Sequence, residues 1–338
     1  MQAADISRPM SQRPDPDRVP DPAPPRRHVW AALRICVTLV LLGLLWHLTD
    51  GPQVLALLAQ VEWPWLLAAL AMAHGQVLLS ALRWRLTAAQ LDQPLRKADA
   101  IGEYYLSQFI NLAVPGGVLG DAGRALRQRH QAGMLRAAQA VVLERLVGQM
   151  TLFAVMFCGV IGAVIVPGGL YLPGWVNDLV GCLALCVIAL AGLGAGLMQL
   201  RGPVARAAAG FLAALRRAVL ARGVWPRQMG LSIAILACNL GSFAFCAAAT
   251  GSDLGFVAAV TILPLILTAM MIPLSVGGWG LREGAAAALW PVLAAPAEAG
   301  IAASIAFGLV ILVASLPGVW VLLSRRRPRA AQQGPKAR

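Results

Sequence analysis

The sequence predicts an all-α polytopic membrane protein, and three features of its composition point to this fold class. Hydrophobic residues make up 59% of the 338 residues and charged residues only 13%. The mean hydropathy is +0.70, which is too high for a soluble domain of this length. Several stretches also exceed the roughly 18 apolar residues that indicate a membrane-spanning helix.

Six full transmembrane helices are predicted, one for each long apolar stretch. They cover residues 29–49, 63–82, 138–166, 178–199, 228–249 and 299–323. Residues 1–28 are rich in Pro, Arg and Asp and cannot build a core, so we predict a disordered cytoplasmic tail there. Residues 29–324 form the predicted integral membrane domain, and residues 325–338 form a basic cytoplasmic tail.

The basic residues predict the orientation of these helices. A net charge of +13 also occurs in nucleic-acid-binding proteins, but in a membrane protein it reflects Lys and Arg in cytoplasmic segments, so no nucleic-acid partner is expected. The loops at 50–62, 167–177 and 250–254 contain no Lys or Arg. Apart from Arg145 and Arg282, every Lys and Arg lies before residue 35, after residue 324, or in residues 83–97, 124–136 and 201–227. Basic segments thus alternate with segments that lack basic residues, and both termini are therefore predicted to be cytoplasmic.

The six cysteines are predicted to act as small hydrophobic residues. All of them lie within apolar stretches, and none has the paired spacing beside histidines that a zinc site requires. No disulfide, metal or cofactor is expected. The chain also lacks a Ser-His-Asp, Cys-His or metal constellation, so we assign no catalytic residue and do not expect an enzyme.

Residues 202–223 predict an amphipathic helix on the cytoplasmic side. Pro203 suits a first helical turn, and apolar residues recur at roughly helical spacing between arginines. Such a helix either lies along the inner leaflet, where anionic lipid attracts its arginines, or packs on the bundle as a linker.

Two further segments, residues 104–129 and 267–286, are rich in glycine and resemble each other. Each has an apolar approach with a proline, then a Gly-Gly pair, a third glycine, and an acid close to a base. This is a weak internal repeat, and we predict that its polar and glycine residues bind substrate. In the first segment they are Gln108, Asn111, Gly116, Gly117, Asp121 and Arg124, and in the second Gly277, Gly278, Arg282 and Glu283.

The flanking charges predict that these segments enter the membrane from opposite sides. Residues 104–129 lie between two basic loops, so they enter from the cytoplasm and return. Residues 255–297 begin outside and either re-enter from the exterior or cross twice with a break at the glycines. Non-helical backbone at this depth is tolerated only beside protein or a water-filled cavity. Interrupted segments of opposite orientation are typical of an inverted repeat around a transporter's substrate site, where half-helix N-termini favour an anion.

Two charges, Glu144 and Arg145, fall about two turns inside a predicted span. A charge at the bilayer centre costs roughly 2.5 to 3.5 kcal/mol, so each needs a partner or a cavity. Adjacent helical residues point in different directions, so we expect Arg145 to pair with Asp121, and Glu144 with Arg282 or Arg124. The alternative is that these charges only lock the hairpins in place.

The chain resembles a known family at these residues. The elements "RWR", "NLAVPGGVLGDAGRA", "VVLERLVG" and "PLSVGGWGLREG" follow one another as in the transmembrane region of the lysylphosphatidylglycerol synthase/flippase family, over about residues 30–325. In that family the membrane domain is understood as a lipid flippase or lipid-handling module. The resemblance implies that the lipid path is lined by Asp121, Arg124, Glu144, Arg145, Arg282 and Glu283. No soluble stretch here is long enough for the aminoacyltransferase domain that some members carry.

These observations favour a bacterial inner-membrane flippase or transporter. We expect it to hold the headgroup of an anionic or modified (glyco)phospholipid between the two broken hairpins, with membrane lipid as its partner. Two alternatives remain: a non-transporting accessory to a lipid-modifying or glycosyl-transfer enzyme, and a component of a lipid aminoacyl or glycosyl transferase.

Overall fold

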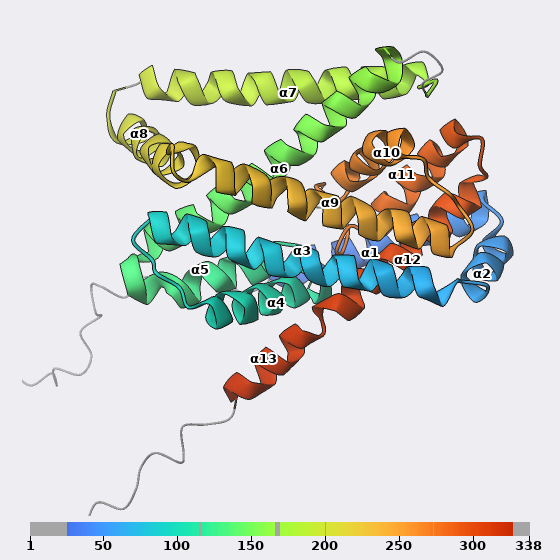
Figure 1. Cartoon of the computed structure of the whole chain (residues 1–338), viewed down its shortest axis with the longest axis horizontal. Coiled ribbons are helices and arrows are strands. Elements are labelled where there is room, and N and C mark those ends of the chain that lie inside the picture. The colour runs from blue at the N-terminus through green and yellow to red at the C-terminus, as the bar shows by residue number, and fades with distance from the viewer. Residues whose placement is uncertain (1–25, 115–116, 166–169, 200, 273, 327–338) are drawn as a thin grey trace, which may run out of the picture.

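The computed structural model describes residues 26–114, 117–165, 170–199, 201–272 and 274–326, and these ranges contain helices and turns but no strand (Figure 1). Within these ranges six helices are long and apolar enough to cross a membrane, which confirms the predicted fold class. They are Val29–Leu48, Trp63–Gln90, Met134–Ile165, Gly174–Leu197, Trp225–Ala249 and Ala297–Ser324. Of the predicted tails at 1–28 and 325–338, residues 1–25 and 327–338 lie outside the described residues. Residues 26–28 instead begin α1, and residues 325–326 end α13.

The helices follow one another along the chain with short connections. In order they are α1 (Arg26–Leu48), α2 (Gly51–Ala59), α3 (Trp63–Gln90), α4 (Lys97–Ala113), α5 (Leu119–Ala132), α6 (Met134–Ile165), α7 (Gly174–Gln199), α8 (Pro203–Leu215), α9 (Trp225–Ala249), α10 (Phe256–Ala269), α11 (Leu281–Leu289), α12 (Ala297–Ser315) and α13 (Pro317–Arg326). A π-helical turn, η2 (Arg216–Leu220), follows α8, and a 3-10 turn, η3 (Trp290–Leu293), follows α11.

Helices α3 and α9 pack side by side in antiparallel directions (Figure 1). Near one end of the pair, Ser242 Oγ donates a hydrogen bond to the Ala69 carbonyl at 2.9 Å. Near the other end, Gln228 Nε2 donates to Thr87 Oγ1, also at 2.9 Å. These bonds satisfy buried polar groups where two apolar helices meet.

The first glycine-rich segment forms a hairpin of α4 and α5. Arg127 Nε on α5 donates to Glu103 on α4 at 2.7 Å, and nearer the tip Ser107 Oγ donates to Asp121 Oδ1 at 2.9 Å. The pairing is antiparallel, because residues farther along α4 meet residues earlier in α5.

The second glycine-rich segment forms another hairpin, of α10 and α11. These helices have 14 and 9 residues, or about 21 and 14 Å at 1.5 Å per residue, and each is shorter than a bilayer core of about 30 Å. Trp290, directly after α11, donates from Nε1 to Ser252 Oγ at 3.3 Å. Since Ser252 precedes α10, the chain returns to the end of the bundle from which it entered.

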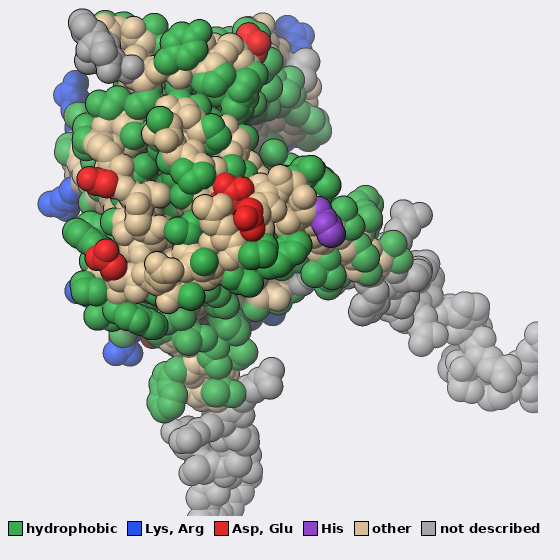
Figure 2. Space-filling view, turned by 90° about the vertical axis from the view of Figure 1, so that its right-hand side faces the viewer, with side chains coloured by type: hydrophobic (Ala, Val, Ile, Leu, Met, Phe, Trp, Pro, Cys, Tyr) green, Lys and Arg blue, Asp and Glu red, His purple; other side chains and the backbone are tan. Residues whose placement is uncertain are grey.

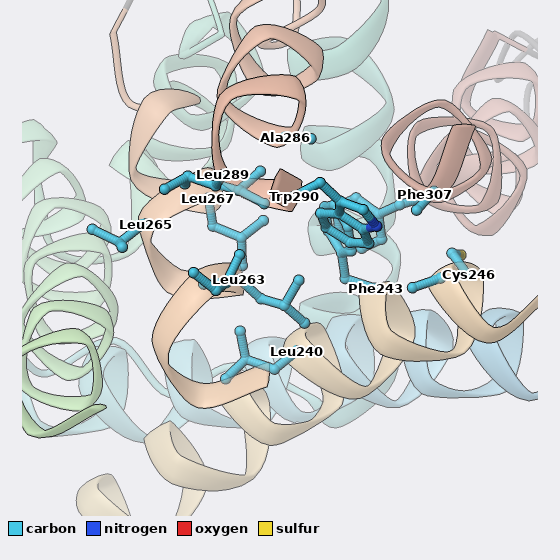
Figure 3. Close-up of a cluster of buried hydrophobic side chains, with 14 of the residues drawn as sticks. Leu240, Phe243, Cys246, Leu263, Leu265, Leu267, Ala286, Leu289, Trp290 and Phe307 are labelled. Atoms are coloured by element: carbon cyan, nitrogen blue, oxygen red, sulfur yellow. The ribbon is translucent and has the colours of Figure 1, made fainter. Parts of the chain in front are cut away.

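A hydrophobic core holds the second hairpin against α6, α9 and α12 (Figure 3). Trp290 is fully buried, and the rings of Phe243 and Phe307 lie beside it with their centroids 4.7 Å apart. Burying aromatic and aliphatic side chains here fixes the hairpin in the bundle.

The last predicted span is broken into α12 and α13. Pro317 begins α13 and has no backbone N–H to continue the helix, so the chain bends after Leu316. Helix α13 then packs along α4, where Gly318 lies against the Tyr105 carbonyl. Two predicted spans contribute little to the core: the most apolar windows of α1 and α7 are only 6% and 0% buried.

The two ends of the bundle differ in charge. The end with α2 shows acidic side chains in its middle and basic ones only at its margin (Figure 2), and it includes Asp50, whose amide donates to Glu298 Oε1 at 3.2 Å. At the opposite end Asp92 pairs with Arg217 at 2.5 Å and with Arg136 at 2.8 Å. The hydrogen bond from Arg217 is the main cause that lowers the pKa of Asp92.

Candidate functional site

A cavity of about 530 Å³ lies inside the bundle, between the tips of the two hairpins. The first tip contributes Gly117 and Val118, and the second contributes Ser275, Gly277 and Gly278. The remaining walls come from α3, α4, α5, α6, α9, α10 and α12, and their polar lining residues are Gln76, Ser80, Arg83, Tyr104, Gln108, Asn111, Asp121, Glu144, Arg145, Gln149, Ser232 and Asn239.

The two tips also approach each other directly. Gly277 has a φ of +58°, and a side-chain carbon at this position would lie 3.6 Å from the Leu112 carbonyl oxygen. Segments 165 residues apart in sequence thus meet at one hollow. This is the arrangement that a shared substrate site between two hairpins requires.

Asp121 is held at the first tip by residues of both helices. It is the third residue of α5, where backbone amides lack helical partners and the helix dipole favours an anion. Ser107 Oγ donates to its Oδ1 at 2.9 Å, and Asn111 Nδ2 to its Oδ2 at 3.3 Å. Asn111 Oδ1 accepts from the Gly120 amide at 2.8 Å, which fixes the start of α5.

A buried ion network joins this tip to α3 and α6. Glu144 accepts from Arg83 at 2.7 Å, from Arg124 at 3.3 Å and from the Tyr104 hydroxyl at 3.3 Å. Arg124 also pairs with Asp121 at 3.1 Å, and Asp121 pairs with Arg145 at 2.7 Å. The predicted Asp121–Arg145 pair is confirmed, and of the two partners predicted for Glu144 the structure has Arg124.

Arg124 is fixed by aromatic rings as well as by charge. Its guanidinium lies 4.4 Å from the Trp84 ring centroid and 4.7 Å from that of Tyr104, and the side chain is 0% exposed. Cation–π contact in a desolvated place stabilises the charge but leaves no face open to a ligand. Arg124 therefore lies behind the wall of the cavity.

The network carries a net charge of +1, since the three guanidiniums of Arg83, Arg124 and Arg145 face the two carboxylates of Asp121 and Glu144. The side chains of Arg83 and Arg124 are 4% and 0% exposed, whereas that of Arg145 is 46% exposed. Of the three, Arg145 is the guanidinium that a ligand in the cavity can reach.

A second buried ion pair lies at the start of α11. Arg282 Nη2 is 2.6 Å from Glu283 Oε1, and Ser304 Oγ donates to the same oxygen at 3.0 Å. Glu283 Oε2 accepts from the Gly280 amide at 2.6 Å, which caps the helix. Both charged side chains are 0% exposed and neither lines the cavity. The guanidinium lies 5.4 Å from the ring centroid of Phe307, which does line the cavity.

The structure brings together most of the residues predicted from the sequence. Those at the cavity are Gln108, Asn111, Gly117, Asp121, Glu144, Arg145, Gly277 and Gly278. Arg124 lies directly behind them, whereas Arg282 and Glu283 form a separate pair. Gly116 lies outside the described residues.

Arg83 was missed as a member of the site. We expected a loop to begin at residue 83, but α3 continues to Gln90 and carries Arg83 on its buried face. A polar stripe could have revealed it: Gln76, Ser80, Arg83 and Thr87 recur at spacings of four, three and four residues. Polar residues at this spacing share one helical face.

One family model matches the chain, that of the lysylphosphatidylglycerol synthase TM region, over residues 30–318. The match covers well over half of the sequence. The chain belongs to this family. Searches of curated proteins and of solved structures found no match.

Membership of the lysylphosphatidylglycerol synthase TM-region family agrees with the architecture. The matched residues include both hairpins and all of α3 to α12, so the cavity lies wholly within the family region. The chain is a multi-pass membrane protein of a lipid-associated family.

Proposed function

We propose that this protein is an inner-membrane lipid flippase that binds the anionic headgroup of a phospholipid or glycophospholipid in the cavity between its two hairpins. The observation that carries this proposal is the net positive ion network beside two glycine-rich tips. A cavity of this kind attracts an anion, and glycines leave backbone amides accessible to it.

Arg145 is the proposed phosphate ligand. Its guanidinium can donate two hydrogen bonds to phosphate oxygens, and it is already oriented by Asp121. Asp121 competes with the phosphate for the same guanidinium, which limits the affinity and allows release. Arg83 and Arg124 contribute positive potential, while Glu144 holds both of them in place.

Arg282 and Glu283 take an indirect part in this proposal. They support the cavity wall through Phe307 and the cap of α11, and they do not contact the headgroup. This assignment differs from the direct contact that the sequence implied.

The proposed orientation follows from the charge of the two ends. The end that carries Asp92 and its arginines faces the cytoplasm, as do both termini, and the end with α2 faces outward. In this orientation the α4–α5 hairpin enters the bilayer from inside and the α10–α11 hairpin from outside. Two opposed half-crossings around one site would let access alternate between leaflets.

The test compares two arginines of α6 in proteoliposomes. Arg145 and Arg136 have side chains 46% and 50% exposed, and each pairs with one aspartate, but Arg136 lies away from the cavity. The Arg145→Gln variant is expected to lose most of the transfer of a labelled anionic phospholipid between leaflets, while Arg136→Gln keeps it. Full transfer by Arg145→Gln would refute the proposed role of this arginine.

The alternatives make different predictions in cells that lack the protein. A flippase alters the distribution of a lipid between leaflets, a transferase component alters lipid composition, and an accessory protein copurifies with its enzyme. Measuring lipid content and lipid sidedness in the same cells separates the three.

A further inference from the structure

A layer of uncharged amide side chains lines the cavity next to the ion network. Gln76 lies seven residues before Arg83 on α3, and Asn239 lies seven residues after Ser232 on α9. Seven residues are nearly two helical turns, or about 10 Å. Arg83 donates to Ser232 at 3.0 Å, so the two helices are in register there. Because α3 and α9 are antiparallel, both amides are displaced toward the same end of the bundle.

Gln149 adds a third amide to this layer. It follows Arg145 by one helical turn on α6, so it lies on the same face and about 6 Å farther along the axis. Gln108 on α4 similarly follows Tyr104 by one turn and also lines the cavity. The cavity therefore has a charged layer and, beside it, an amide layer.

The amide layer has free hydrogen-bonding capacity. Within the described part of the chain, the side chains of Gln108, Gln149 and Asn239 make no hydrogen bond to protein. Ser275 Oγ, which is buried at the second tip and lines the cavity, also has no partner among the described residues. Ser275 is buried, where a polar group without a partner is costly, whereas the three amides are half-buried. A hydroxyl-rich ligand would satisfy their donors and acceptors alike.

Among its described lining residues, the same cavity offers no free carboxylate for a cation. Glu144 is engaged by Arg83 and Arg124, and Asp121 by Arg124 and Arg145, so both carboxylates at the cavity are already paired with guanidiniums. An ammonium group would also meet a network of net charge +1. Like charge in a partly desolvated place disfavours binding.

The geometry points to an anionic lipid with a hydroxylated, uncharged headgroup extension as the ligand of this cavity, in preference to an aminoacylated lipid. This inference rests on the proposed function. The phosphate lies at Arg145, and the hydroxyls reach the amide layer formed by Gln76, Gln108, Gln149 and Asn239. The ligand thus differs in charge from lysylphosphatidylglycerol, the lipid in the family's name.

The test measures binding of three lipids to the full-length protein in detergent. Phosphatidylglycerol carries one negative charge and hydroxyls, phosphatidylethanol carries the same charge without hydroxyls, and lysylphosphatidylglycerol is cationic. We expect phosphatidylglycerol to bind about five- to tenfold more tightly than phosphatidylethanol, the effect of about one net hydrogen bond. Lysylphosphatidylglycerol is expected to bind most weakly.

Two variants locate this preference. Gln149→Leu and Asn239→Leu should each reduce binding of phosphatidylglycerol about fivefold and leave binding of phosphatidylethanol unchanged. Asn177→Leu is the matched control, since Asn177 is an exposed amide on α7 away from the cavity. A variant that weakens binding of both lipids equally would overturn the role of that amide, because an equal loss is what general damage to the fold would cause.

The outcomes separate this inference from the proposed function. Equal binding of phosphatidylglycerol and phosphatidylethanol by the wild-type protein, or tighter binding of lysylphosphatidylglycerol, would overturn the headgroup assignment while a lipid site stands. Failure of every anionic lipid to bind would overturn the proposed function itself. Glycerol phosphate tests whether a soluble phosphate ester could be the ligand in place of a lipid. If glycerol phosphate binds as tightly as phosphatidylglycerol, the lipid is refuted as the ligand, whereas weaker binding supports the lipid.

Discussion

Arg145 and Asp121 form an ion pair 2.7 Å long, while nearly half of the Arg145 side chain stays exposed at the cavity. The pair joins α6 to the tip of the α4–α5 hairpin. The Arg145 guanidinium thus pairs with an internal carboxylate and remains within reach of a ligand. The competition between these two partners is the physical basis of the first prediction.

The Asp121→Asn variant is expected to bind anionic phospholipid about tenfold more tightly than the wild type, a difference of ~1.4 kcal/mol. The substitution keeps the shape of the side chain but frees Arg145 and makes the network more positive. Tighter binding slows release, so leaflet-to-leaflet transfer should fall. Lipid titration followed by a transfer assay measures both quantities. Weaker binding would mean that Asp121 itself contacts the ligand.

Glu144→Gln is expected to destabilise the protein by about 3 kcal/mol or more, because it leaves Arg83 and Arg124 buried without a full counter-charge. The free energy of unfolding in detergent micelles measures the effect. Asp92→Asn is the control: Asp92 also pairs with two arginines but is exposed, and Asn tolerates its φ of +62°. An equal loss in both variants would contradict a buried network.

The Arg282–Glu283 pair is expected to be structural. Arg282→Met alone should destabilise by about 3 to 5 kcal/mol, because it leaves the Glu283 carboxylate buried without its guanidinium. Adding Glu283→Gln should restore much of that stability, since the Gln oxygen still accepts from the Gly280 amide. Lipid transfer by the double variant should stay close to the wild-type rate. A stable double variant without transfer would instead place Arg282 on the lipid path.

The spans and the central ion pair could be predicted from the sequence for clear physical reasons. A bilayer demands long apolar helices, and a charge within one of them demands a partner. Asp121, in the first glycine-rich segment, was the acid predicted to meet Arg145, and the structure has this pair. The return of α11 to the start of α10 was left open, because it depends on tertiary packing of Trp290 beside Ser252.

Two features were missed because simple local rules fail near helix ends. Arg83 follows an apolar stretch and resembles the first residue of a loop, yet α3 continues for two more turns. Arg282 was one of the two partners expected for Glu144, yet it pairs with Glu283, its neighbour in sequence. They pair because Glu283 reaches back to the Gly280 amide at the first turn of α11, which turns its carboxylate toward Arg282.

Close contact between α6 and α10 sets the spacing between the ion network and the second hairpin, and two glycines of α6, Gly159 and Gly162, test this. At Gly159, α6 touches α10: a side-chain carbon would overlap the Val260 carbonyl oxygen and lie 3.1 Å from Thr261 Cα. At Gly162, one turn farther along, no atom lies within 4 Å of such a carbon. Gly159→Ala should push the helices apart and cost about 1 to 3 kcal/mol, whereas Gly162→Ala should be neutral or stabilise by up to ~1 kcal/mol.

The two alanine variants also differ in their expected effect on the site. Helix α6 carries Glu144 and Arg145, and α10 leads into the second tip through Leu267, so separating them widens the cavity. Gly159→Ala is therefore expected to lower both the unfolding temperature and the rate of lipid transfer, while Gly162→Ala leaves transfer unchanged. Equal behaviour of the two variants in both measurements would show that α6 and α10 do not meet at Gly159.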